Sequence, residues 1–164
     1  MKRVNLRTAD VGFDKDDPAG YHTAYARLGP ALGGALLGGS LYELPPGQSI
    51  CPYHYEWGNE EWLLVVAGRV ALRHPGGEDE LEPGELVCFP VGPEGAHKVT
   101  NREETAARVV IFSTKIDPSA SVYPDSGKIG IWPAPGSGDA LMVRQSSKVD
   151  YWDGELGSAG AEPS

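Results

Sequence analysis

Two histidines and two glutamates are spaced as the ligands of a metal site would be. They are His54, Glu56, Glu61 and His97. Side chains two residues apart on a strand point to the same side, so His54 and Glu56 are expected to aim at one common point. A four-residue loop lets Glu61 return to that point from a neighbouring strand, and His97 would arrive from a separate hairpin. Imidazole nitrogens and carboxylate oxygens that converge in this way suit a first-row divalent ion such as Mn, Fe, Ni, Co or Zn.

Short strands are the elements that must position these four residues. The runs that read as strands are 35–44, 50–55, 61–66, 70–74, 80–82, 85–89, 96–101 and 108–114. Turn residues separate them, and 22 glycines and 14 prolines supply many tight turns. Strands at intervals of roughly 8–12 residues, without a long helical period, are typical of a sandwich or a barrel. The sequence therefore predicts an all-β fold.

The two blocks of sequence around these residues resemble the two motifs of the cupin superfamily, G-x5-H-x-H-x(3,4)-E-x6-G and G-x5-P-x-G-x2-H-x3-N. Six residues separate the first glycine from the first histidine here, and the matching positions are Gly47, His54, Glu61, Gly68, Gly84, Pro90, His97 and Asn101. The resemblance implies a double-stranded β-helix, the cupin jelly-roll barrel of two packed antiparallel sheets. It also implies a metal held by three histidines and one glutamate at one mouth, and frequent dimerisation. We expect the barrel at residues 31–115, between irregular extensions at 1–30 and 116–164, with little order from Gly154 onward unless a partner holds it.

Beyond that difference of one residue, the sequence departs from the family pattern at two places. Glu56 stands where the motif has its second histidine, and the loop at 91–96 is two residues longer than the motif allows. Two carboxylates would neutralise a divalent cation, which lowers its Lewis acidity and favours harder ions over Cu or Ni. Glu56 is either a fourth ligand or the mark of a site that has lost its ion. Glu60 would replace Glu61 as the ligand if the strand register were shifted by one residue.

Composition and charge narrow the possible partners. The chain has 164 residues and a net charge of −9, with no basic cluster. Nucleic acid and anionic lipid are bound mainly through Lys and Arg, so we expect neither as a partner. The most apolar stretch, 31–44, is too short and too rich in glycine to span a membrane. Cys51 and Cys88 are too few for a disulfide framework and are expected as buried free thiols, although a Cys51–Cys88 bridge is an alternative. A cytoplasmic location is the default.

Three classes of function remain open, because a fold alone does not specify an activity. The leading hypothesis is a metal-dependent enzyme, isomerase-like or dioxygenase-like, that acts on a small polar metabolite. The alternative is a non-catalytic cupin module that binds a sugar or another small molecule. A structural or assembly role is the third, and a homodimer is expected by analogy with the family. The tryptophans fit core or interface packing, but Trp57, in the loop between two ligands, could instead line the mouth of the pocket.

Overall fold

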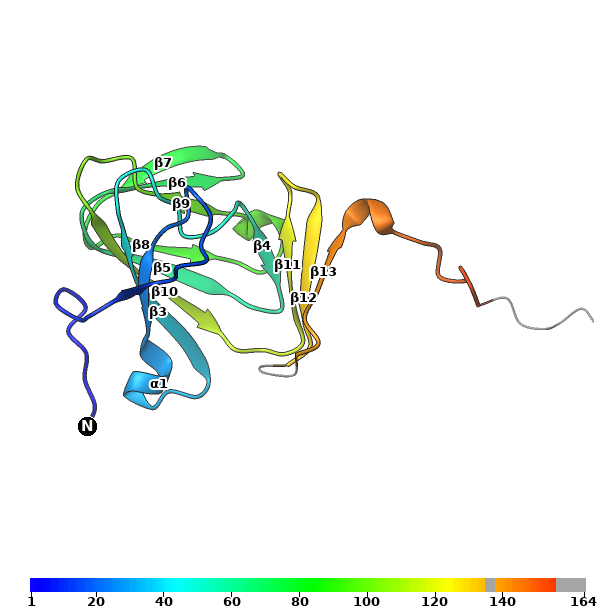
Figure 1. The fold of residues 1–164 in the computed structure, drawn as a ribbon, viewed down its shortest axis with the longest axis horizontal. Coiled ribbons are helices and arrows are strands. Elements are labelled where there is room, and N and C mark those ends of the chain that lie inside the picture. The colour runs from blue at the N-terminus through cyan, green and yellow to red at the C-terminus, as the bar shows by residue number, and fades with distance from the viewer. Residues whose placement is uncertain (135–137, 156–164) are drawn as a thin grey trace, which may run out of the picture.

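Antiparallel strands in two layers form a barrel in the computed structural model, which describes residues 1–134 and 138–155 (Figure 1). The strands are β1 (Gly12–Phe13), β2 (Ala24–Arg27), β3 (Leu37–Leu44), β4 (Tyr55–Trp57), β5 (Glu61–Ala67), β6 (Val70–His74), β7 (Gly77–Leu81), β8 (Leu86–Phe89), β9 (Lys98–Thr100), β10 (Ala107–Thr114), β11 (Ser119–Tyr123), β12 (Lys128–Trp132) and β13 (Leu141–Arg144). The short helices are α1 (Leu28–Leu32), η1 (Pro93–Gly95) and η2 (Gln145–Ser147). None of the helices in the described ranges has the length and apolar character needed to cross a membrane. The all-β, double-stranded β-helix prediction is confirmed.

The first layer is a sheet with the strand order β1-β2-β3-β10-β5-β8. β10 lies between β3 and β5 and pairs with β3 along its whole length, from Ala107 opposite Leu44 to Thr114 opposite Leu37. The turn from β5 to β6 contains Gly68, whose φ is +73°. A Cβ at this position would lie 2.8 Å from Cα of Ala107, so the turn accepts only glycine.

The second layer consists of two sheets, β7-β6-β9 and β4-β11-β12-β13. Two isolated antiparallel bridges join them, one between Ser49 and Thr100 and the other between His54 and His97. The predicted strand at 50–55 is therefore wrong in detail, since only its last residue belongs to a strand, β4. Pro52 explains the interruption, because proline has no N–H to donate to a sheet ladder.

Apolar side chains from both layers fill the barrel. The cluster of buried residues contains Leu44, Leu63, Val65, Val70, Leu72, Leu81, Phe89, Val99, Ala107 and Val109. Because the alternating side chains of each strand divide between the two faces of its sheet, the inner residues meet here. A second, smaller cluster of Leu28, Leu41 and Val110 lies on the outer face of the first layer. Figure 1 shows the N-terminal segment on that side of the barrel.

Both terminal segments contribute strands to the layers. β1 and β2 extend the first layer at β3, and residues before β1, including Val4 and Leu6, pack on its outer cluster. β11 pairs with β4 and so brings the predicted C-terminal extension to the second layer. After β13 the chain runs away from the barrel as an arm (Figure 1). We predicted little order from Gly154 onward. Most of that segment, residues 156–164, lies outside the described residues.

Candidate metal centre

The two layers bring His54, Glu61 and His97 together at one place. Glu61 is the first residue of β5 and pairs with Ser113 on β10 and Phe89 on β8. His54 and His97 each stand just before a strand of the opposite layer. Their backbones exchange hydrogen bonds, from the N–H of His54 to the carbonyl of His97 at 3.1 Å and in the reverse direction at 2.8 Å. This bridge fixes the two imidazoles beside each other and opposite the carboxylate.

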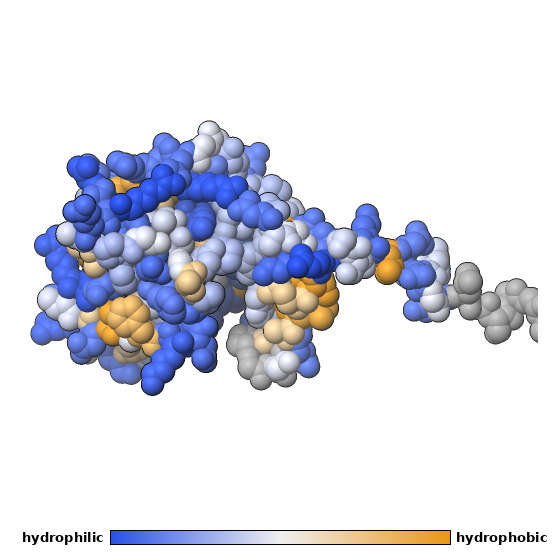
Figure 2. Space-filling view, turned by 45° about the horizontal axis from the view of Figure 1, so that its top comes forward, coloured by the Kyte–Doolittle hydropathy of each residue, from blue (hydrophilic) through white to orange (hydrophobic). Residues whose placement is uncertain are grey.

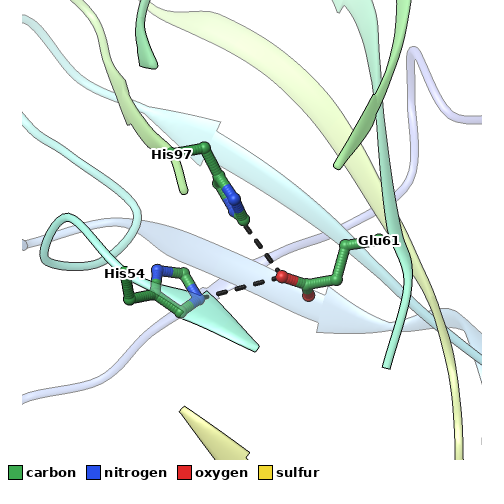
Figure 3. Close-up of side chains that lie close together, drawn as sticks. All are labelled: His54, Glu61 and His97. Atoms are coloured by element: carbon green, nitrogen blue, oxygen red, sulfur yellow. Dashed lines mark ion pairs between the residues drawn. The ribbon is translucent and has the colours of Figure 1, made fainter. Parts of the chain in front are cut away.

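The ligand atoms of these three residues converge on one point (Figure 3). Nε2 of His54 lies 3.8 Å from Oε2 of Glu61, and Nε2 of His97 lies 3.5 Å from the same oxygen. All three ligand atoms lie within 4.8 Å of one another. Ligand atoms about 2.1 Å from one cation would be roughly 3.0–3.4 Å apart, so small side-chain movements would close the site on an ion.

The environment of the imidazoles fixes which nitrogen faces the carboxylate. Nδ1 of His54 lies 3.0 Å from the carbonyl of Pro52, and Nδ1 of His97 lies 2.9 Å from the carbonyl of Gly95. A carbonyl only accepts, so each Nδ1 carries the proton and each Nε2 presents a lone pair. Nε2 of His97 is buried and has no hydrogen-bond partner among the described residues. Backbone-anchored imidazoles with a free Nε2 are the arrangement found at protein metal sites, so these residues fit a divalent cation.

Aromatic rings hold the imidazoles in place from the sides. The ring of Phe89 stacks on that of His97 with the centroids 3.7 Å apart and the planes at 7°. Tyr123 stacks on His54 with the centroids 5.7 Å apart and the planes at 21°. His97 is 1% exposed and His54 is 8% exposed, so water has little access to either ring. The packing predefines the positions of both nitrogen ligands.

Burial makes the three residues neutral in the absence of a cation. Burial, and then the neighbouring His54, lower the pKa of His97 to about 3, and burial also lowers the pKa of His54. Burial, and then the neighbouring Glu56, raise the pKa of Glu61 to about 8. The dashed lines in Figure 3 therefore join atoms at ion-pair distance that carry no opposite charges near pH 7. A divalent cation would supply the missing positive charge and favour the carboxylate form of Glu61.

The structure brings together three of the four predicted ligands. Among the described residues, the group of ligand atoms close enough to hold an ion contains His54, Glu61 and His97 but not Glu56. Oε1 of Glu56 accepts a hydrogen bond of 2.9 Å from the hydroxyl of Ser121 on β11. The role of Glu56 as a ligand stays a prediction. Glu60, the alternative for a shifted register, instead accepts a hydrogen bond from the indole of Trp62.

Two hollows open beside Glu61. One has a volume of about 280 Å³ and is lined by Glu56, Asn59, Glu61, Ser113, Thr114, Lys115, Asp117, Ser119 and Trp132. The other, of about 560 Å³, is lined in part by Tyr25, Arg27, Ser40, Tyr42 and Glu61. Burial is the main cause that raises the pKa of Tyr42 to about 12, so its phenol stays a hydrogen-bond donor at neutral pH. A larger hollow of about 700 Å³ is lined by none of the three cluster residues.

Sequence reasoning missed several residues of this site. Tyr42, Tyr123 and Trp132 lie outside both motif blocks, and only their alternation with buried neighbours hints at an inward direction. Trp57, the tryptophan suggested for the mouth, is 48% exposed and packs edge-on against Tyr55. The two cysteines are free thiols, as expected, but both are only partly buried.

Comparison with known proteins identifies the fold family. Residues 40–113 match the family model described as "Cupin domain". A sugar phosphate isomerase of the cupin superfamily from Silicibacter pomeroyi is 22% identical, with a TM-score of 0.76 over 92% of this chain and 98% of that one. A candidate sugar phosphate isomerase from Acidithiobacillus ferrooxidans is 23% identical, with a TM-score of 0.73 over 80% of this chain and 81% of that one. The polyketide cyclase RemF from Streptomyces resistomycificus is 23% identical, with a TM-score of 0.58 over 73% and 83% of the two chains.

At these identities the solved structures establish the fold and not the activity. No curated protein matches the sequence. The family match runs from β3 to β10 and contains all three residues of the cluster. With the two antiparallel layers and the cluster at their mouth, it shows that residues 40–113 of this chain form a cupin domain.

Proposed function

We propose that this protein is a metal-dependent isomerase that acts on a small, sugar-like polar metabolite. The observation that carries the proposal is the convergence of Nε2 of His54, Nε2 of His97 and the carboxylate of Glu61 beside two polar hollows. The names of the two structures support this reaction class over the dioxygenase class, since the Silicibacter protein is named a sugar phosphate isomerase and the Acidithiobacillus protein a candidate for that activity.

In this proposal His54, His97 and Glu61 hold a divalent cation of the Mn, Fe, Zn, Co or Ni group. When bound, the cation supplies Lewis acidity toward two oxygens of the substrate. The chain itself holds both imidazoles neutral and oriented through the carbonyls of Pro52 and Gly95. The two hollows beside Glu61 would receive the substrate.

Metal content provides the first test. We expect roughly one divalent ion per chain after growth in metal-replete medium, and its loss in the variant His97→Ala. His22→Ala is the matched control, because His22 is exposed and lies outside the cluster. A cation at one hundred times its Kd stabilises the folded protein by about 2.7 kcal/mol, or roughly 5–10 °C in Tm. Wild-type protein without stoichiometric metal, and without a Tm response to any of the five ions, would contradict the metal site.

Activity tests separate the enzyme from the alternative. Metal-loaded protein should interconvert aldose and ketose forms of sugars or sugar phosphates, followed by NMR, and His97→Ala should not. The alternative, a non-catalytic sugar-binding module, is favoured by Glu56, which replaces the second histidine of the family motif. Saturable sugar binding without turnover would support that alternative. Oxygen consumption by the metal-loaded protein with an organic substrate would favour the dioxygenase class instead.

The predicted homodimer has a candidate interface on the outer face of the second layer. Trp57, Ile131 and Leu141 lie in one row across β4, β12 and β13 and are 48%, 37% and 52% exposed. Figure 2 shows apolar surface where the C-terminal arm leaves the barrel. A second copy that covers this row would also protect the edge strand β13.

Light scattering tests the dimer directly. We expect the wild type to be a dimer at micromolar concentration and Ile131→Lys to be a monomer, with Leu86→Lys as a control at an exposed position of the other layer. A wild-type monomer would refute the interface. The cytoplasmic location stays a prediction.

A further inference from the structure

Trp132, on β12, lies on the face of the second layer that carries the metal cluster. Glu56, Ser121 and Gly130 stand side by side across β4, β11 and β12. Side chains two residues apart on a strand share a face, so Trp132 lies on the same side as Gly130 and Glu56. The hydrogen bond between Ser121 and Glu56 confirms the direction of this face. β12 thus forms a wall of the site, although it lies outside both family motifs.

A glycine lets the indole lie close against this wall. A Cβ on Gly130 would collide with the outer ring carbons of Trp132, with its Cζ3 at 2.7 Å, and with Cε of Met142 at 3.0 Å. Gly130 is buried, and Trp132 is partly exposed. The ring therefore lies close against Gly130 and leaves part of its surface exposed. Any side chain at position 130 would push the indole away from the sheet.

The open part of the indole faces a polar hollow. Trp132 lines the hollow of about 280 Å³ together with Glu56 and Glu61, and every other described residue that lines it has a polar side chain. Lys115 adds a positive charge, Asp117 and the two glutamates add carboxyl groups, and Ser119 adds a hydroxyl. One flat apolar surface among many hydrogen-bonding groups matches a sugar ring, which has C–H groups on its faces and hydroxyls around its edge. A fatty chain would cover the charged groups of Lys115 and Asp117 without pairing them, and pairing is what makes the burial of such groups tolerable.

We propose that Trp132 is the platform on which the sugar ring of the ligand stacks, and that it is the specificity-determining residue of this pocket. The proposal rests on the proposed function, because Glu61 lines this hollow and a sugar ring bound on Trp132 would lie beside the cluster. Trp132, rather than Trp57, is then the tryptophan that selects sugars. An aromatic contact of this kind corresponds to about a tenfold change in affinity.

The test measures sugar binding by the metal-loaded, full-length protein. The probes are an aldohexose and its 6-phosphate, and the readouts are tryptophan fluorescence and calorimetry. We expect saturable quenching in the wild type, and in Trp132→Ala a Kd raised about tenfold with the quenching lost. Trp132→Phe keeps a flat ring and should recover part of the affinity. Gly130→Val should raise Kd as Trp132→Ala does, because it displaces the ring.

Three controls make the result decisive. Trp57→Phe, on the opposite face of the sheet, should leave Kd and quenching unchanged. Metal content and Tm of Trp132→Ala should equal those of the wild type, since Trp132 is not a ligand and is partly exposed. If Trp132→Ala binds both sugars as tightly as the wild type, or if the wild type binds neither, the platform is refuted. Binding that depends on Trp132 without turnover would uphold the platform and refute only the isomerase.

Discussion

Replacing Glu61 by glutamine should make the metal-free protein more stable. In the empty site this carboxyl has its pKa raised to about 8 from a usual 4.5, mainly by burial and then by Glu56. Between pH 4.5 and pH 8, Glu61 therefore keeps its proton in the folded state and loses it in the unfolded state. The free energy of unfolding falls as pH rises through this range. At pH 7, which is 2.5 units above 4.5, this effect lowers the free energy of unfolding by about 3 kcal/mol. At pH 5 it lowers the free energy of unfolding by less than about 1 kcal/mol. A neutral amide of the same shape avoids this cost.

Urea unfolding with chelator present, at several values between pH 5 and 8, measures this difference. The free energy of unfolding of Glu61→Gln should exceed that of the wild type by an amount that grows with pH. Glu80→Gln, at an exposed position of β7, should show no such growth. Addition of the preferred cation should reverse the order, because it stabilises only the wild type. A difference that is constant with pH, or a less stable metal-free variant, would refute the assignment of Glu61 to a buried site.

Three further variants test how the fold supports the site. Asn101→Ala removes a buried amide that donates to two backbone carbonyls at 2.8 Å, so we expect a loss of roughly 2–4 kcal/mol in urea unfolding. Arg108→Gln removes a guanidinium that donates to three carbonyls before β1, and hydrogen exchange should rise across residues 4–11 with little change in metal affinity. Gly95→Ala places a Cβ against the backbone of Pro90, and metal affinity should fall at least tenfold by calorimetry, because the carbonyl of Gly95 orients His97. Unchanged values in these assays would contradict the roles given to Asn101, Arg108 and Gly95.

The sequence alone determined most of the strand pattern between residues 35 and 114 and three residues of the candidate metal site. Turn residues divide the chain into short runs, and the resulting strand at 70–74 has the bounds that the structure gives to β6. His54, Glu61 and His97 could be found because the family motifs fix their spacing. Local chemistry decides these features, since proline and glycine end strands wherever they lie and alternation sets the direction of a side chain.

Only the tertiary structure decided what surrounds these residues. The free Nε2 of His97 depends on the carbonyl of Gly95 and on the ring of Phe89, which comes from the other layer. Trp132 is 78 residues away from His54 along the chain, as its number shows, and reaches the site because β12 pairs with β11 and β11 with β4. No local pattern encodes such a pairing. It follows from the register of hydrogen bonds between strands, which is set when the two layers close around their shared core.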